Sequence, residues 1–296
     1  MMETIPNQGA IMTAVQSVTL SNSVEMPLEG FGVFQVPDLA ECQQATEWAL
    51  EAGYRLIDTA AVYGNEEAVG AALKAVGLPR DEIFVTTKLW VQDMGQESGK
   101  RAFATSLAKL GLDHLDLYLI HQPFNDYYGA WRALEELYDQ GAVRAIGVSN
   151  FYPDRLVDLA LNSRITPMVN QVECHPFHQQ TQAMATMAEL GVHTQAWGPF
   201  AEGQNGIFTN PVLTDIGAAH GKSAAQVALR WNTQRGVSVL PKSVHRERIE
   251  ANLDVWDFEL NDQEMTSIAG LDGQLRIADH HAVEMVRRIN GIRIHD

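Results

Sequence analysis

Four residues that could together move a proton follow three successive apolar runs of the sequence. Asp58 ends the run RLID, Lys88 ends IFVTTK, His121 ends LDLYLIH, and Tyr63 lies in the loop AAVYGNEE after Asp58. A lysine ammonium beside a phenol favours the phenolate, so Lys88 is expected to lower the pKa of Tyr63 from its usual value near ~10. Tyr63 would then be a general acid. Asp58 would keep Lys88 charged, and His121 would donate a hydrogen bond to a substrate oxygen.

Each of these residues taken alone also has a structural interpretation. Asp58 and Lys88 could form a buried ion pair that braces two neighbouring strands. A loop tyrosine is more often a packed amphipathic side chain, and a lone histidine is more often a hydrogen-bonded core residue. Their joint placement at successive strand ends favours the catalytic interpretation.

The next strand ends carry neutral hydrogen-bonding groups and an indole. Ser149 and Asn150 end AIGVSN, Gln171 ends MVNQ, and Trp197 ends VHTQAW. Neutral donors and acceptors suit a carboxamide, and an indole offers a flat face to an aromatic ring. Together these residues describe a nicotinamide site.

A basic segment, PKSVHRER, follows the last apolar run. It places Lys242, Ser243 and Arg248 at the start of a predicted helix, whose N-terminal end favours an anion such as a 2′-phosphate. A solvated basic helix start is the alternative for this segment alone. The candidate glycine loop, Gly30-Phe-Gly32-Val-Phe-Gln, lacks the third glycine of a dinucleotide-binding loop, so a Rossmann site is rejected.

These residues can meet only if the fold gathers the strand ends at one face. Apolar runs alternate with helix-like segments over about 250 residues, which predicts a (β/α)8 TIM barrel with its chemistry on the loops after the strands. A β-hairpin around Ser21-Asn22-Ser23 is expected before the barrel, where it could plug the N-terminal mouth. Asp38 is expected to cap a helix ending near Ala52. Further helices are predicted over 66–76, 97–110, 128–140, 154–162, 180–190, 223–235 and 246–253.

Length and composition bound the class of protein. The chain has 296 residues, 46% of them hydrophobic, which predicts a flexible extension over residues 1–15 and a single catalytic domain over residues 16–296. The formal net charge of -16 argues against a nucleic-acid or anionic-membrane partner. Cys42 and Cys174 have neither disulfide-framework nor zinc-site spacing, and no apolar run approaches the ~18 residues of a membrane span. The first residues do not resemble an export signal, so a cytoplasmic location is expected.

Blocks within residues 16–275 resemble the aldo-keto reductase superfamily, nearest to its bacterial 2,5-diketo-D-gluconate reductase branch. The matching blocks occur in the family's order: RLIDTAAVYGNEEAVG, IFVTTKLW, LYLIHQP, IGVSNF, NQVECHP, WGPF and LPKSVHRERIEANL. The resemblance implies a catalytic tetrad made of Asp58, Tyr63, Lys88 and His121. It implies cofactor contacts at Ser149, Asn150, Gln171, Trp197, Gly198, Pro199, Lys242, Ser243, Val244, Arg248 and Asn252. It also implies a monomer that reduces a carbonyl with NADPH and without a metal.

Three features depart from the family pattern. Glu250-Ala251-Asn252 stands in the adenine loop, which leaves the adenine contact open. Gln122 follows the catalytic histidine where mammalian branches often have tryptophan, which favours sugar-like or small polar carbonyls over bulky steroids. The tail 274–296, including His280 and His281, matches no family block. Because family tails commonly close the substrate pocket, the resemblance implies a C-terminal active-site loop.

The sequence therefore predicts an NADPH-dependent reductase of aldehydes, α-dicarbonyls or keto sugars. Phe34, Trp90 and Phe124 are expected to line the substrate pocket, with ordinary rim packing as the alternative. A metal site built on His121, His175 and His178 is not expected, because no carboxylate cluster accompanies them. Two other functions stay open: a Schiff-base aldolase using Lys88 and a cofactor-binding regulatory subunit with little turnover.

Overall fold

The first element of the fold is a β-hairpin at the amino-terminal end of a barrel. The computed structural model describes residues 15–296, so the predicted flexible extension lies almost wholly outside the described residues. Strand β1 (Ser17–Thr19) pairs antiparallel with β2 (Glu25–Pro27). Between them, Asn22 Nδ2 donates a hydrogen bond to Arg144 O (2.9 Å), near the start of a barrel strand. The hairpin therefore lies against the amino-terminal mouth, as expected.

An eight-stranded parallel sheet follows, with its strands side by side in chain order. The strands are β3 (Phe31–Gly32), β4 (Leu56–Asp58), β5 (Phe84–Leu89), β6 (Leu115–Ile120), β7 (Val143–Ser149), β8 (Val169–Glu173), β9 (His193–Trp197) and β10 (Ser238–Val239). The first and last strands are joined by hydrogen bonds from Gly30 N to Val239 O (2.9 Å) and from Gly32 N to Pro241 O (3.0 Å). These bonds close the sheet, and the predicted (β/α)8 barrel is confirmed.

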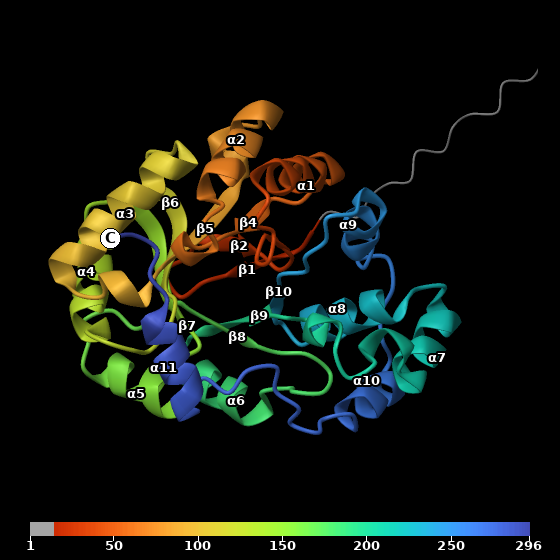
Figure 1. Ribbon diagram of the computed structural model, residues 1–296. Helices are drawn as coiled ribbons and strands as arrows, with labels where there is room; N and C mark the ends of the chain where they lie inside the picture. The colour runs from red at the N-terminus through yellow and green to blue at the C-terminus, as the bar shows by residue number, and fades with distance from the viewer. Residues whose placement is uncertain (1–14) are drawn as a thin grey trace, which may run out of the picture.

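Helices surround the sheet as an outer ring (Figure 1). Those predicted are α1 (Leu39–Ala52), α2 (Glu66–Val76), α3 (Gln96–Leu110), α4 (Tyr127–Asp139), α5 (Pro153–Leu161), α6 (Thr181–Glu189), α8 (Ala224–Gln234) and α9 (Arg246–Leu253), each within one residue of its expected bounds. Asp38 caps α1 by accepting a hydrogen bond from Glu41 N (2.9 Å), and Gly53 ends it with φ 116°. A left-handed backbone conformation costs glycine little free energy, so Gly53 can end the helix.

Three helices were not predicted: α7 (Pro211–His220), α10 (Asp262–Ala269) and α11 (Val283–Gly291). The tail expected to be a loop therefore contains a helix, and the chain from α10 to α11 runs past α6 along the rim of the barrel (Figure 1). None of the helices within residues 15–296 is long and apolar enough to cross a lipid bilayer.

Strands β5 and β6 are buried along their whole length. Helices cover their outer faces and side chains fill the barrel interior, as in other parallel barrels. Lys88 on β5 is among the largest fully buried side chains. Because burying an unpaired amine costs a large free energy, its partners identify the centre of the site.

Candidate active site

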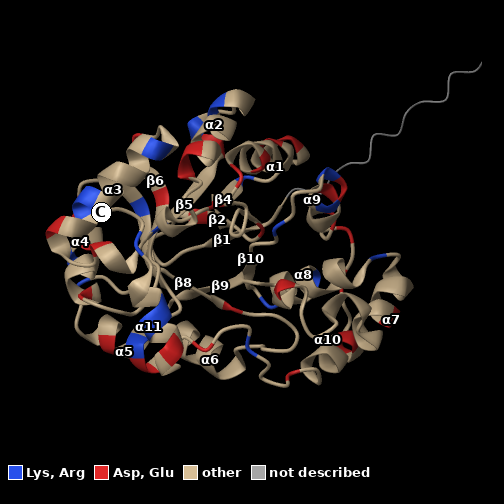
Figure 2. Ribbon diagram, in the orientation of Figure 1, with Lys and Arg blue, Asp and Glu red and all other residues tan. Residues whose placement is uncertain are grey.

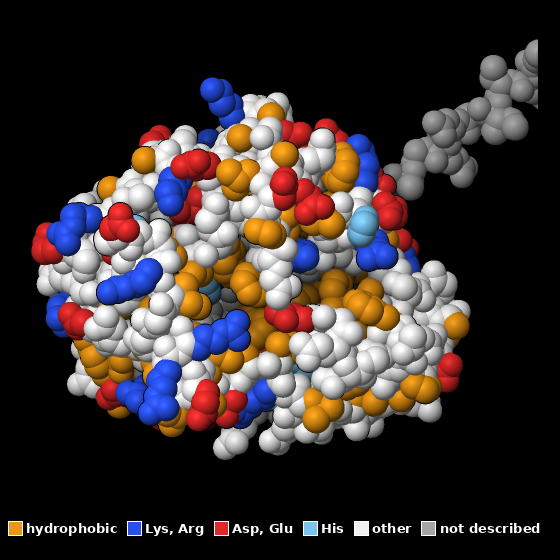
Figure 3. Space-filling model, viewed as in Figure 1, with side chains coloured by type: hydrophobic (Ala, Val, Ile, Leu, Met, Phe, Trp, Pro, Cys, Tyr) orange, Lys and Arg blue, Asp and Glu red, His pale blue; other side chains and the backbone are white. Residues whose placement is uncertain are grey.

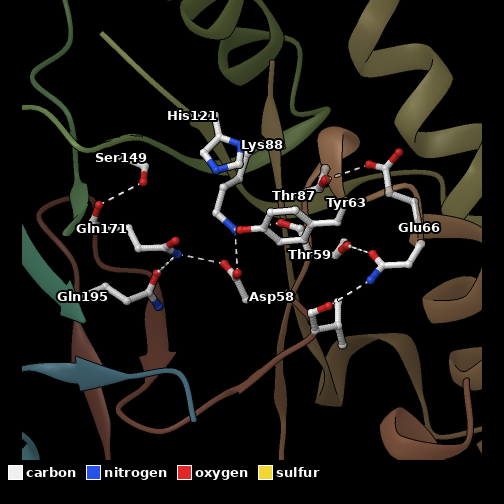
Figure 4. Close-up of polar contacts among 12 residues, drawn as sticks. Asp58, Thr59, Tyr63, Glu66, Thr87, Lys88, His121, Ser149, Gln171 and Gln195 are labelled. Carbon is white, nitrogen blue, oxygen red and sulfur yellow. Dashed lines mark hydrogen bonds and ion pairs between the residues drawn. The ribbon is translucent and has the colours of Figure 1, made fainter. Parts of the chain in front are cut away.

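Lys88 lies at the centre of a polar cluster at the carboxyl ends of the strands (Figure 4). Its Nζ donates hydrogen bonds to Asp58 Oδ1 (2.5 Å) and Thr59 O (2.8 Å), and it lies 3.4 Å from Tyr63 Oη. Three acceptors match the three hydrogens of an ammonium. Burial lowers the pKa of Lys88, and the negative charge of Asp58 opposes that change.

The strand register explains why these groups meet. Asp58 on β4 is opposite Thr86 on β5. Alternate residues of a strand project to the same face, so Lys88, two positions beyond Thr86, lies above the end of β4. Tyr63 ends a short helical turn, η1 (Ala61–Tyr63), which follows β4.

Asn65 fixes the loop that carries Tyr63. Its side chain accepts a hydrogen bond from Thr59 Oγ1 (2.8 Å) and donates one to Val33 O (2.9 Å). Asn65 is fully buried, so these bonds replace the water it would otherwise need. The loop is thereby tied to both neighbouring strands, and the phenol is held beside Lys88.

The prediction that Lys88 lowers the pKa of Tyr63 is wrong. Burial raises the pKa of Tyr63 well above its ordinary value, and the negative charges of Asp58 and Glu202 add to the increase. The positive charge of Lys88 therefore does not outweigh burial and the two carboxylates. A raised pKa keeps the proton on the oxygen at neutral pH, so the phenol is present as a donor.

Glu66 is a further buried carboxylate that the sequence analysis did not assign. It lies in the first turn of α2, is 2% exposed, and accepts a hydrogen bond from Thr87 Oγ1 (2.7 Å). Its charge, like that of Asp58, acts to raise the pKa of Lys88. The sequence could have pointed to Glu66, because it lies in the segment AAVYGNEE that also contains Tyr63.

His121 lies beside the phenol at the end of β6. Its ring meets the rings of Tyr63 and Trp90 edge to face, with centroids 5.6 Å and 5.2 Å away. Burial lowers the pKa of His121 well below its ordinary value, and the charge of Lys88 lowers it further. The imidazole is therefore neutral at physiological pH and carries one N–H to donate.

The residues predicted to bind a carboxamide form a connected hydrogen-bond network on β7 to β9. Gln171 Nε2 donates to Asp58 Oδ2 (2.8 Å) and Gln195 Oε1 (2.8 Å). Ser149 Oγ donates to Gln171 O (2.9 Å). Both amide hydrogens of Gln171 are thus used within the protein, and its oxygen is the group left for a ligand.

Asn150 orients the indole of Trp197. Asn150 Oδ1 accepts a hydrogen bond from Trp197 Nε1 (2.9 Å), while its amide donates to His121 O (3.1 Å) and Ser149 Oγ (3.1 Å). Asn150 has φ 61°, a left-handed conformation that asparagine tolerates better than most residues. Gly198 and Pro199 follow Trp197 directly at the end of β9.

The basic segment lies at the start of α9, as expected. Figure 2 shows basic positions at the first turn of α9 and on the chain leading into it from β10. Lys242 and Arg248 are exposed, and neither side chain pairs with another residue in the described part of the chain. Ser243 Oγ accepts from His245 N (3.1 Å) and so shapes the turn. Val244 lies half-buried in that turn, and Asn252 is buried further along α9.

The mouth of the barrel is a hollow with many hydrophobic side chains inside it and charged side chains around it (Figure 3). Phe34 is 48% exposed and its ring lies 4.9 Å from that of Tyr63. Trp90 packs on His121 and is buried, whereas Phe124 is half-buried in the loop after β6. Gln122 is buried, and its Oε1 has no hydrogen-bond partner among the described residues. Within residues 15–296 no group of three or more His, Cys, Asp or Glu side chains is arranged to hold a metal ion.

Fold and site together define a parallel barrel with a cluster of buried ionisable side chains at the carboxyl ends of its strands, where enzymes of this fold have their active sites. The sequence profile of the aldo/keto reductase family matches residues 30–272. The chain belongs to this family, as predicted, while its assignment to the 2,5-diketo-D-gluconate reductase branch stays a prediction.

Known proteins similar to this chain include two reductases and a solved complex. A 9,11-endoperoxide prostaglandin H2 reductase of Trypanosoma cruzi is 47% identical over 262 residues, which is 88% of this chain and 93% of that protein. A glyoxal reductase of Bacillus subtilis is also 47% identical over 262 residues, covering 88% of this chain and 94% of its own. The crystal structure of a Bombyx mori aldo-keto reductase in complex with NADP has a TM-score of 0.85 at 35% identity, covering 90% of this chain and 96% of that one.

Proposed function

We propose that this protein is an NADPH-dependent reductase that transfers a hydride to the carbonyl carbon of aldehydes, α-dicarbonyls or keto sugars. The observation that carries the proposal is the position of Lys88 Nζ between Asp58 Oδ1 and Tyr63 Oη at the barrel mouth. The similar proteins support it, since one is named a glyoxal reductase and another was solved with NADP. Residues 16–296 are proposed to act as one catalytic domain, as a monomer in the cytoplasm.

The basic residues before and on α9 fit the phosphate end of this cofactor. Arg246 is already paired with Glu51 (3.3 Å) and Glu250 (2.9 Å), whereas Lys242 and Arg248 are exposed and make no such pair in the described chain. Two exposed cations at a helix start suit the additional 2′-phosphate that distinguishes NADPH from NADH.

The residues of β7 to β9 fit the nicotinamide end. Gln171 Oε1 is available to accept from a carboxamide N–H, because Gln171 Nε2 already donates twice within the protein. Trp197 is held by Asn150 and can present its indole face to the ring. NADPH, when bound, supplies the hydride.

Tyr63 would donate the proton that the reduced carbonyl oxygen requires. Its raised pKa keeps the phenol protonated before the reaction, and the nearby ammonium of Lys88 stabilises the phenolate that forms. Asp58 and Glu66 favour the charged form of Lys88. His121, as a neutral imidazole, would hold the carbonyl oxygen by donating a hydrogen bond, so the oxygen lies between two donors.

The test of this proposal follows an isotope from cofactor to product. NADPH carrying deuterium at C4 is incubated with the protein and a panel containing an aldehyde, an α-dicarbonyl and a keto sugar. We expect oxidation of the cofactor and deuterium on the carbinol carbon of at least one alcohol. Absence of cofactor oxidation across the panel, or an alcohol without the label, would contradict hydride transfer.

The Schiff-base alternative predicts a different product. A lysine that forms an imine must offer a free amine lone pair to a carbonyl carbon. The Nζ of Lys88 is fully buried and directed at three oxygen acceptors, which does not favour that chemistry. Borohydride with a carbonyl substrate should therefore leave Lys88 unmodified in a peptide mass spectrum, whereas a reduced adduct on Lys88 would support an aldolase.

A further inference from the structure

A buried carboxyl group lies between the closure of the barrel and the helix that is proposed to bind the cofactor phosphate. Glu29 directly precedes Gly30, whose N–H bonds to the last strand, and its side chain is fully buried. Glu29 Oε2 accepts a hydrogen bond from Trp256 Nε1 (2.9 Å), in the segment that follows α9. Glu29 Oε1 has no hydrogen-bond partner among the described residues. One oxygen of this carboxyl group can therefore still accept a donor.

Tyr54 connects the same carboxyl group to α9. Its hydroxyl donates a hydrogen bond to Ile249 O (3.2 Å), a backbone carbonyl within α9. The hydroxyl also lies close enough to Glu29 to lower the pKa of that carboxyl by hydrogen bonding. Burial raises the pKa of Tyr54 well above its ordinary value, and the charge of Glu29 adds to the increase, so the phenol keeps its proton. A phenol has one hydrogen to donate, so Tyr54 can bond fully to Glu29 or to Ile249, but not to both.

The charged side chains around Glu29 are bonded to other groups or are exposed. Those with partners are Arg55, bonded to Leu50 O and Tyr54 O, Arg230, paired with Glu259, and Arg246, paired with Glu51 and Glu250. The exposed ones on α9 and just after it are Glu247, Arg248, Asp254 and Asp257. Burial is the largest influence on Glu29 and raises its pKa from 4.5 to about 8, while hydrogen bonds from Trp256 and Tyr54 act in the opposite direction. The carboxyl is therefore mostly protonated at pH 7 and mostly ionised at pH 9.

Ionisation of Glu29 changes which acceptor receives the Tyr54 hydrogen. A buried carboxylate needs donors, and hydrogen bonds to a charged acceptor are stronger than those to a neutral one. The phenol is therefore expected to turn its hydrogen from Ile249 O to the carboxylate. Helix α9 packs beside α1, and Tyr54 follows α1 in the chain (Figure 1). Loss of the bond at Ile249 O thus releases one attachment of the α9 backbone to the barrel.

This attachment lies next to a residue of the proposed cofactor site. Ile249 is buried against the barrel, whereas its neighbour Arg248 is exposed and is proposed to meet the 2′-phosphate. We propose that Glu29 and Tyr54 are positioning residues for α9, which hold the helix in place for the cofactor phosphate while the Glu29 carboxyl is protonated. This inference rests on the proposed function, because it assumes that NADPH binds at α9.

The experiment measures the dissociation constant for NADPH at pH 7 and at pH 9 by fluorescence titration of wild type and three variants. In wild type the constant should rise about fivefold between the two pH values, which is the contribution of one neutral hydrogen bond. A phosphate monoester is already ionised over this range, because its second pKa is about 6. Glu29→Gln stays neutral at both pH values, so its constant should change by less than about 1.5-fold. Glu51→Gln removes an exposed carboxylate beside the same helix and should follow wild type.

Tyr54→Phe separates this positioning effect from a general loss of stability at high pH. Glu29 still ionises in this variant, but α9 has no hydroxyl bond to lose. NADPH should therefore bind about fivefold more weakly than in wild type at pH 7, with no further weakening at pH 9. Circular dichroism at both pH values checks that each protein is folded.

The outcomes distinguish this inference from the proposed function. A wild-type dissociation constant that does not change with pH would overturn the positioning role of Glu29 and Tyr54. A pH dependence like that of wild type in Glu29→Gln or in Tyr54→Phe would overturn it as well. Absence of NADPH binding to wild type at pH 7 would instead overturn the proposed function.

Discussion

Replacement of Asp58 by asparagine tests the buried charge pair on which the site depends. Asp58 uses both carboxylate oxygens, because Oδ1 accepts from Lys88 Nζ (2.5 Å) and Oδ2 accepts from Gln171 Nε2 (2.8 Å). Asparagine has nearly the same shape but only one oxygen. Its NH₂ group must therefore face one of the two donors. Gln171 cannot simply rotate its amide, because its Nε2 also donates to Gln195 Oε1.

The expected loss follows from burial. Lys88 is fully buried, and removing one partner of a buried ion pair costs about 3 to 5 kcal/mol of unfolding free energy. Lys88 can limit this cost by losing its proton, since burial already lowers its pKa and Asp58 is the main group that opposes the change. A folded-state lysine pKa below the unfolded value means that stability rises with pH. The Asp58→Asn variant should therefore be most impaired near pH 6.5 and recover part of its deficit near pH 9.5.

The loss of stability is measured by urea unfolding of wild type and Asp58→Asn near pH 6.5 and near pH 9.5, followed by tryptophan fluorescence. Asp113→Asn is the control, because the Asp113 side chain is 87% exposed and pairs only with His114 at the surface. The control should unfold like wild type. An Asp58→Asn variant as stable as the control, or a deficit that grows with pH, would refute the account of the buried pair. The variant should also lose turnover more steeply than wild type as pH rises, because less of its Lys88 is charged.

One single and one double variant probe other charged groups. Glu29 is fully buried and accepts a hydrogen bond from Trp256 Nε1 (2.9 Å), and burial raises its pKa from 4.5 to about 8. This raised folded-state pKa contributes stability that is complete below pH 4.5 and is lost as pH rises through 8. Glu29→Gln should therefore exceed wild type by about 5 kcal/mol at pH 9 in urea unfolding; equal stability there would contradict the burial of the carboxyl. The double variant Lys242→Ala/Arg248→Ala should weaken NADPH binding at least about tenfold in fluorescence titration while NADH stays within about twofold. Arg246→Ala serves as control, and equal weakening of both cofactors would place the 2′-phosphate elsewhere.

The barrel was predictable because its signals are local. Helix α1 has a capping aspartate before it and a left-handed glycine after it. Helices α4 and α8 also have both signals, and α2, α3 and α6 have the left-handed glycine alone. Helix α7 also carries such a signal, since Asn210 caps it and Pro211 opens it. Helix α11 has few buried residues of its own.

The sequence predicts which residues come together at the site, but it does not predict their pKa values. Parallel strand ends meet at one edge, so the positions of Asp58, Lys88 and His121 in the sequence already placed them together. The pKa of Tyr63 depends on burial and on Glu202, a residue far along the chain, and composition around the loop does not reveal either. The position of the tail depends on its contact with Glu173, more than 100 residues earlier in the chain, which no local pattern encodes.

The central claim is that the Tyr63 phenol donates the proton in carbonyl reduction, and Tyr63→Phe tests it most directly. Phenylalanine keeps the ring that packs 4.9 Å from Phe34 and removes only the oxygen beside Lys88. Single-turnover and steady-state rates of NADPH oxidation with an aldehyde should fall at least about 100-fold, because general acid catalysis contributes on that order, while the dissociation constant for NADPH stays within about twofold. A variant that keeps turnover within about threefold of wild type, with the cofactor bound equally well, would contradict the account.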